Sequence, residues 1–198
     1  MTDKERILTH LSANNGVVSA KTVRQMGLDT KALQRLANNG VLERVAHGLY
    51  MDADQLDDPF LVAQYRCPKG VYSMDSALFL HHLTDRNPVR MTFTIPSKSN
   101  TGLLNEPERY LFYYLKNGLW NLGQTTVTSP YDNPLTVYDI ERTICDCIRK
   151  SDDLDRNEII LALKAYFKTP GARFNVLLDY ADAFRIRDTV RQYMEVLR

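Results

Sequence analysis

The sequence predicts an α+β protein with a small amino-terminal helical domain and a larger carboxy-terminal domain. Three patterns support this fold class. Apolar residues recur at helical spacing near the amino end, and two short strand-like stretches then flank a His-Gly turn. Strand-like alternation dominates the middle of the chain, and helical spacing returns from about residue 135. We therefore expect a helical unit with a hairpin, then a small mixed sheet, then a helical bundle.

Three helical patterns precede the hairpin. The first covers residues 4–12, with apolar side chains at three- and four-residue spacing along one face. A short second helix follows Ser19, a residue type that caps helices, and Gly27 ends it. Asp29 or Thr30 can cap the third helix. A short turn thus separates the second and third helices.

The hairpin consists of residues 41–46 and 49–51, joined by His47-Gly48, where glycine is free to adopt positive φ. Helix, helix, turn, helix and hairpin in this order predict a winged helix-turn-helix over residues 1–51. DNA is therefore the first partner to consider, and a small protein-docking domain is the alternative.

The outward face of the third helix has the chemistry of a DNA-reading surface. Thr30, Gln34 and Asn38 recur every four residues, with Lys31 and Arg35 on the neighbouring row. Arginine can bind guanine through two hydrogen bonds, glutamine or asparagine can bind adenine, and lysine or threonine can hold phosphates. We expect this face to lie in a major groove.

The second helix and the hairpin complete the predicted DNA-binding surface, because Arg44 and His47 near the hairpin tip could reach the backbone or the minor groove. The candidate DNA-binding residues are Ser19, Lys21, Thr22, Thr30, Lys31, Gln34, Arg35, Asn38, Arg44 and His47. Residues 1–51 contain seven Lys or Arg against four acidic residues. This small surplus suits a specific binder of modest affinity.

Composition limits the other functional classes. The 198 residues are 44% hydrophobic and 25% charged, and the net charge of +1 excludes a general polyanion binder. No apolar run approaches the roughly eighteen residues of a membrane span, and the amino end lacks a signal-peptide core. We expect a cytoplasmic protein. Cys67, Cys145 and Cys147 fit neither a disulfide framework nor a zinc site, so reduced thiols without metal or cofactor are expected.

The acidic stretch 52–66 is expected to be a linker with a short connecting helix near its end, and residues 67–198 to form the second domain. Its expected elements are a helix over 73–83, strands over 89–95, 109–115 and 119–129, and four amphipathic helices from about residue 135. The simplest packing is a small sheet covered on one face, with the helices forming a bundle against it.

One cluster of charged residues is a candidate catalytic site. Asp139, Arg142 and Asp146 lie close to one face of a predicted helix, with Glu141 beside them. Such a set could bind a metal or phosphate, but a structural ion-pair network is the favoured interpretation. Gly-rich phosphate loops, G-x-S-x-G and H-E-x-x-H are absent from the sequence. We expect no enzymatic activity; a winged-helix-guided nuclease using Asp139 and Asp146 stays an alternative.

Five stretches, taken together and in this order, resemble the AbiEi family. They are Ala46-His-Gly-Leu-Tyr50, Ser76-Ala-Leu-Phe-Leu-His-His-Leu-Thr-Asp85, Phe93-Thr-Ile-Pro96, Val137-Tyr-Asp-Ile-Glu-Arg-Thr-Ile-Cys-Asp146 and Leu178-Asp-Tyr-Ala181. The proteins of that family are antitoxins of type IV toxin-antitoxin and abortive phage-infection systems. The resemblance extends over nearly the whole chain.

The resemblance implies a winged helix that represses its own operon by binding inverted repeats, and a carboxy-terminal domain that counteracts the toxin. The family's cognate toxin resembles a nucleotidyltransferase, and the two proteins need not form a stable complex. The glycine-serine and paired-aspartate signature of a nucleotidyltransferase is absent here, which favours the antitoxin over the toxin. A stand-alone transcriptional regulator with a ligand-sensing or dimerising second domain is a further alternative; an apolar pocket lined by convergent polar groups would favour it.

Overall fold

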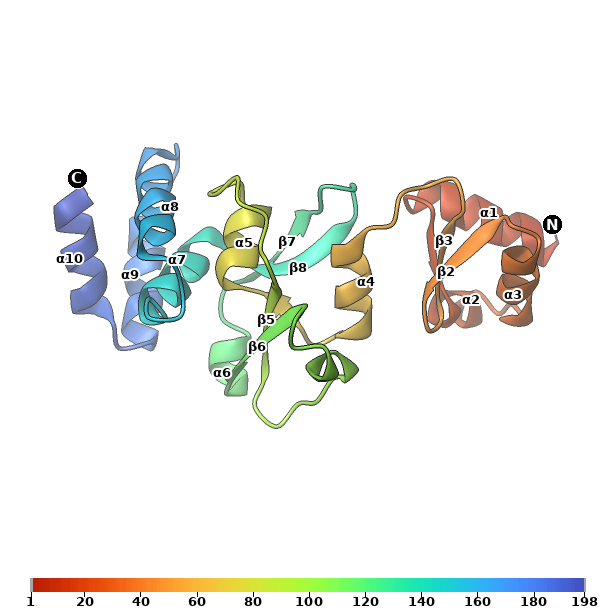
Figure 1. Ribbon diagram of the computed structural model, residues 1–198, viewed down its shortest axis with the longest axis horizontal. Helices are drawn as coiled ribbons and strands as arrows, with labels where there is room; N and C mark the ends of the chain where they lie inside the picture. Colours follow the sequence, from red (N-terminus) through yellow and green to blue (C-terminus); the bar gives the residue numbers. More distant parts are fainter. Residues whose placement is uncertain (1, 198) are drawn as a thin grey trace. The chain divides into compact units, whose positions relative to one another are not determined.

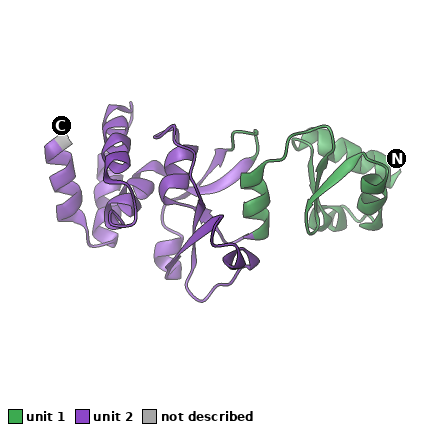
Figure 2. Cartoon of the chain, viewed as in Figure 1, with its two compact units in different colours: residues 1–66, 129–133 green, residues 67–128, 134–198 purple. Residues whose placement is uncertain are grey.

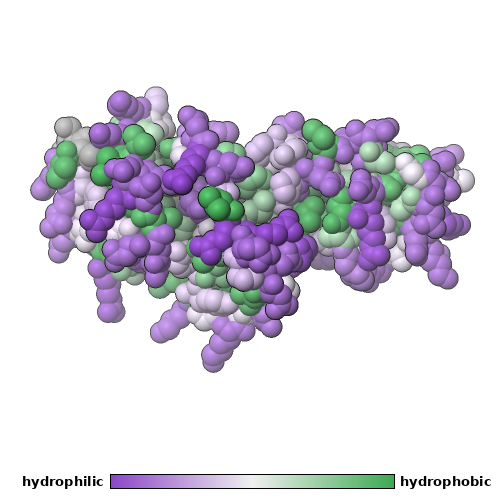
Figure 3. Space-filling view, viewed as in Figure 1, coloured by the Kyte–Doolittle hydropathy of each residue, from purple (hydrophilic) through white to green (hydrophobic). Residues whose placement is uncertain are grey.

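The computed structural model describes residues 2–197, and the chain divides into two compact units. Unit 1 comprises residues 1–66 and 129–133, and unit 2 comprises residues 67–128 and 134–198 (Figures 1 and 2). Helices and small sheets are present in both units, so the α+β class is confirmed. Among the described residues, none of the helices combines the length and the apolar character needed to cross a membrane. Exposed apolar side chains are scattered among hydrophilic ones (Figure 3).

Unit 1 has the element order that the sequence predicts, with one added strand. The elements are α1 (Asp3–Ala13), β1 (Val17–Ser19), α2 (Ala20–Gln25), α3 (Lys31–Asn38), β2 (Leu42–Ala46), β3 (Leu49–Asp52) and α4 (Pro59–Arg66). The strands form an antiparallel sheet in the order β1-β3-β2. Strand β1 was not predicted, because three residues are too few to show alternation.

Local side-chain bonds set where the helices of unit 1 begin. The Ser19 hydroxyl accepts a hydrogen bond from the Thr22 amide at 2.9 Å, so the predicted cap of α2 is confirmed. At α3, the Asp29 carboxylate accepts from the Lys31 amide at 2.9 Å, whereas the Thr30 side chain makes no capping bond. Gly27 has a φ of +72°, which lets the chain turn between α2 and α3.

The apolar faces of α1, α2 and α3 meet in one core. Ile7, Leu11, Val23, Leu33 and Leu36 are all buried, as the helical spacing predicts. Because these side chains occupy one side of each helix, the opposite side of α3 is left to the solvent.

The acidic stretch after β3 ends in a structured cap. Asp58 is fully buried, and its Oδ1 accepts hydrogen bonds from the amides of Phe60 and Leu61 at 2.9 and 3.0 Å. Its Oδ2 accepts from the Ser129 hydroxyl at 2.6 Å and from the Asn133 amide at 3.0 Å. The carboxylate therefore starts α4 and also fixes residues 129–133. Residues 52–66 belong to unit 1, because they pack with it, and unit 2 begins at residue 67.

Unit 2 combines a five-stranded mixed sheet with a helical carboxy-terminal part. Its elements are β4 (Val71–Tyr72), α5 (Met74–Leu80), β5 (Met91–Pro96), η1 (Gly102–Asn105), β6 (Tyr110–Leu115), α6 (Asn117–Trp120), β7 (Gln124–Thr128), β8 (Pro134–Tyr138), α7 (Ile140–Arg149), α8 (Arg156–Lys168), α9 (Phe174–Ala183) and α10 (Arg187–Leu197). The strand order is β6-β5-β4-β8-β7, with β5 and β6 parallel and β4 and β8 parallel.

The start of the helical region is a correction. A helix was expected from about residue 135, but residues 134–138 form β8. Thr136, Val137 and Tyr138 are residue types that favour strands. Asp139 then caps α7, because its Oδ1 accepts from the Arg142 amide at 2.8 Å. The four expected helices are present, and the first begins at Ile140.

Several boundaries in the sheet region also differ. The helix α5 ends at Leu80 instead of residue 83, and the Ser73 hydroxyl accepts from Thr94 instead of capping the helix. Residues 117–120 form α6, so the expected strand over 119–129 is confined to β7. Thr92 and Thr94 are buried along with Phe93, so β5 is covered on both faces. The expectation of one covered face is wrong for this strand.

The apolar stripes of α7 to α10 pack into one core, as predicted. Ile144, Ile159, Leu163, Leu177 and Val190 are buried in this cluster. The three cysteines are buried as free thiols. Burial raises the pKa of the Cys145 thiol to about 12, which keeps it protonated and unreactive at neutral pH.

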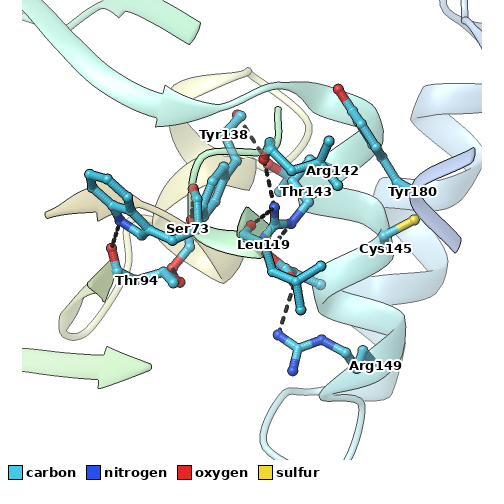
Figure 4. A network of polar contacts seen from close by, with 12 residues as sticks. Ser73, Thr94, Leu119, Tyr138, Arg142, Thr143, Cys145, Arg149 and Tyr180 are labelled. Atoms are coloured by element: carbon cyan, nitrogen blue, oxygen red, sulfur yellow. Dashed lines mark hydrogen bonds and ion pairs between the residues drawn. The ribbon is translucent and has the colours of Figure 1, made fainter. Parts of the chain in front are cut away.

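A buried arginine holds α7 against the loop between α6 and β7 (Figure 4). The Arg142 side chain is fully buried; its Nε donates to Asp146 at 2.9 Å. Its Nη1 donates to the carbonyls of Leu119 and Leu122 at 2.8 and 2.6 Å. The guanidinium carbon lies 4.0 Å from the ring centroid of Tyr138. The ring centroid of Phe184 lies 4.3 Å from the same carbon, so the guanidinium contacts two aromatic rings. Its Nη2 has no hydrogen-bond partner among the described residues.

We expect Arg142→Met to lower the free energy of unfolding of unit 2 by about 3 to 5 kcal/mol, because a buried carboxylate and two carbonyls lose their donor. Urea unfolding followed by the fluorescence of Trp120, the single tryptophan, measures the change. The control is Arg156→Met, since Arg156 pairs with Asp152 at 3.9 Å on the surface and should contribute nothing measurable. Equal transition midpoints for the two variants would contradict the assignment.

Candidate nucleic-acid interface

The exposed face of α3 presents the predicted set of amides and cations. Lys31, Gln34, Arg35 and Asn38 are all exposed, and the helix buries its other face through Leu33 and its neighbours. An eight-residue helix with these side chains on one side offers bidentate donors and acceptors to base edges. Thr30 is half-buried at the start of the helix and lies at the margin of this face.

The candidate residues at and near the start of α2 are one exposed cation and two hydroxyls that hydrogen-bond to each other. The hydroxyls of Ser19 and Thr22 are 2.8 Å apart and hydrogen-bonded, and both residues are half-buried. Lys21, on the first turn of α2, is exposed. The candidate residues on α2 thus offer one positively charged side chain for a phosphate, while the cap occupies the two hydroxyls.

The two basic residues of the hairpin between β2 and β3 are hydrogen-bonded to each other. The Arg44 Nη2 donates to the His47 Nδ1 at 2.9 Å, and both residues are exposed. Because Nδ1 accepts this bond, the proton of the neutral imidazole lies on Nε2. Gly48 has a φ of +73°, and its carbonyl accepts from the Tyr65 hydroxyl at 3.0 Å. The hairpin tip is therefore braced from α4.

Two further polar residues, Lys4 and Asn39, lie beside the predicted face and were not among the candidate residues. Lys4 and Asn39 join Arg35 in lining a hollow of about 380 Å³ between α1 and α3. Lys4 adds a cation on the α1 side of this hollow, and Asn39 an amide next to Asn38. Lys4 and Asn39 lie near each other because α1 packs on α3. The spacing of residues along either helix does not reveal this packing.

The carboxylates proposed for an alternative nuclease serve separate structural roles. Asp146 is fully buried and paired with Arg142 and Arg149, each at 2.9 Å. Asp139 caps α7 with one oxygen, and its other oxygen accepts from Arg173 and Tyr180 at 3.1 and 2.9 Å. Among the described residues, no three or more His, Cys, Asp or Glu side chains gather as a metal site would require. Asp139 and Asp146 are thus both held in ion pairs within the protein, as the favoured interpretation of the sequence expects.

Comparisons with known proteins agree with this arrangement. Residues 5–51 match the family model described as "Transcriptional regulator, AbiEi antitoxin". The crystal structure of the Rv2827c protein from Mycobacterium tuberculosis is similar to this chain, with a TM-score of 0.55 and 12% identity. The similarity covers 92% of this chain and 72% of that one, and it concerns the fold alone. No curated protein matches the chain.

The family match covers α1 through β3, the segment that carries every predicted DNA-binding residue. The resemblance noted in the sequence is thereby confirmed for this domain. Residues 5–51 thus form a domain that is similar to AbiEi antitoxin transcriptional regulators.

Proposed function

We propose that the protein is the antitoxin of a type IV toxin-antitoxin system and represses its own operon through the winged helix of residues 1–51. The partner DNA is a promoter with inverted repeats. The carboxy-terminal domain of residues 67–198 counteracts a nucleotidyltransferase-like toxin in the cytoplasm, and the two proteins need not form a stable complex. The exposed face of α3, within a domain that matches AbiEi regulators, carries this proposal.

The chemistry of α3 favours sequence reading over general DNA coating. Arg35 can donate two hydrogen bonds to guanine, and the amides of Gln34 and Asn38 can pair with adenine. The positive surplus of residues 1–51 is small, so phosphate contacts alone give limited affinity. Specific contacts must therefore supply much of the free energy at the promoter.

The hairpin supplies the backbone contacts that orient α3. The Arg44 guanidinium and the His47 Nε2–H are both donors at an exposed tip. Donors of this kind bind phosphate oxygens and fix the position of a recognition helix without reading sequence. Inverted repeats require two copies on the DNA, and these can meet there as monomers.

We expect Arg35→Ala to weaken binding to the promoter by about 1 to 3 kcal/mol and to relax the preference at one base pair, because a bidentate base contact is lost. Electrophoretic shifts with promoter DNA, single-base variants and scrambled DNA measure both effects. Lys116→Ala is the control, since Lys116 is an exposed residue of unit 2. An equal loss of affinity on promoter and scrambled DNA would contradict a base-reading role.

Lys21→Ala should weaken binding to promoter and scrambled DNA alike and lower the salt dependence by about one ion, because one phosphate contact disappears. The measurement is the affinity for both DNAs at two salt concentrations. A loss confined to the promoter would show that Lys21 reads sequence instead.

DNA binding and protection from the toxin should separate in the full-length protein. Gln34→Ala/Arg35→Ala is expected to release repression of a reporter under the protein's own promoter. The same variant should still restore growth of cells that express the toxin encoded beside it, because unit 2 is unchanged. Loss of protection at an equal protein level would tie neutralisation to DNA binding.

A further inference from the structure

The strand β7 is one edge of the five-stranded sheet and pairs with β8 alone. The pairing is regular over five consecutive residue pairs, from Gln124 with Tyr138 to Thr128 with Pro134. Protein sheets usually protect their edges with lysine, proline, bulges or a covering element. The sequence of β7, Gln-Thr-Thr-Val-Thr, contains no charge and no proline, and threonine and valine favour extended structure.

Two hydrogen bonds at the ends of β7 show which backbone groups face outward. The Asp139 amide donates to the Gly123 carbonyl at 2.7 Å, and the Ser129 amide donates to the Asn133 carbonyl at 2.8 Å. Hydrogen-bonded and non-hydrogen-bonded pairs alternate along an antiparallel ladder. Gly123 and Ser129, at the two ends, are thus in hydrogen-bonded pairs.

The alternation directs the backbone groups of Thr125 and Val127 toward β8. The amides and carbonyls of Gln124, Thr126 and Thr128 point away from the sheet. In the part of the chain that the structure describes, these outward backbone groups have no hydrogen bond in the protein. Thr126 and Thr128 are also exposed. A second extended chain can therefore pair with this edge.

A groove of about 360 Å³ is lined in part by β7. Residues 125–127 of β7 form one side, and residues 169–173 between α8 and α9 form another. His81, Tyr166 and residues 139–141 complete the lining. Such a groove can hold an extended segment. The backbone of the segment can pair with β7, and its side chains can contact the other residues that line the groove.

The charged residues that line the groove are two carboxylates and one guanidinium, and the side chain of Asp139 is 16% exposed whereas that of Glu141 is 5% exposed. Asp139 and Glu141 both accept from Arg173, so two carboxylates face one guanidinium. Burial raises the pKa of Glu141, but hydrogen bonds from Arg173 outweigh this and hold it below its usual value. Burial lowers the pKa of His81, whose Nε2 donates to the Tyr138 carbonyl at 2.6 Å. The imidazole is therefore neutral at pH 7, and the groove favours a cation.

We propose that this groove binds an extended segment of a partner protein, which adds to β7 as a further strand and places a lysine or arginine against Asp139. The outward amide and carbonyl of Thr126 pair with the backbone of that segment. The positive side chain shares the Asp139 carboxylate with Arg173. The proposal concerns unit 2 alone and does not depend on DNA binding.

The test uses a fluorescent heptapeptide of alternating threonine and valine with a central arginine, titrated into the full-length protein and followed by anisotropy. A peptide with central glutamate and one with N-methylated alternate amides are the matched controls. We expect the glutamate peptide to bind at least about tenfold more weakly, because it meets the carboxylates with like charge. N-methylation of the pairing edge should abolish binding.

Variants of the protein locate the site. Thr126→Pro removes only an outward donor, and proline is tolerated on the solvent side of an edge strand. It should abolish peptide binding, whereas Thr126→Ala keeps the amide and should retain it. Glu141→Gln should reduce the preference for arginine over glutamate. Thermal unfolding followed by Trp120 fluorescence checks that each variant is folded.

Three results would overturn the proposal. They are equal affinity for the arginine and glutamate peptides, undiminished binding of the N-methylated peptide, and no binding of any peptide. The peptide arms need no protein variant, so they decide the matter even if Thr126→Pro does not fold. A change from dimer to monomer on Thr126→Pro, without peptide binding, would show that the edge pairs with a second copy of this chain instead.

Discussion

The buried pair of Arg142 and Asp146 is the interaction on which the arrangement of unit 2 depends. The Arg142 guanidinium binds the Leu119 carbonyl of α6 and the Leu122 carbonyl of the loop that follows, and α7 supplies both charged groups. Gly123 shows how closely the segments approach, because a Cβ atom at this position would lie 2.8 Å from the Arg142 Cβ. Since β7 begins at the next residue, Arg142 lies against the segment that leads into the free strand edge.

The same helix also positions the carboxylates of the groove. Asp139 caps α7 and accepts from Tyr180 of α9, and Glu141 accepts from the Tyr166 hydroxyl of α8 at 3.3 Å. The start of α7 is therefore bonded to the two helices that follow it. The interior side of α7 stabilises the unit, while its first turn faces the groove, so one helix joins the core to a candidate binding surface.

Patterns within a single helix were predictable from the sequence, because 3.6-residue spacing reveals a buried face without knowledge of its partner. The exposed face of α3 and the Ser19 cap are examples. Strand β8 was not predictable in the same way, since it lies in the sheet between β7, which directly precedes it, and β4, which comes from a distant part of the chain. Lys4 and Asn39 were missed for a related reason: they meet only through the packing of α1 on α3.

The brace between Tyr65 and Gly48 limits how the hairpin can diverge. A side chain at Gly48 would require an unfavourable positive φ, and its Cβ would lie 3.3 Å from the Tyr65 hydroxyl. Arg44 and His47 carry no such restriction, because both side chains extend into solvent. During evolution, the contacts made by the hairpin can thus change by replacement of Arg44 and His47. Gly48, which is hydrogen-bonded to α4, must stay a glycine for the turn to form.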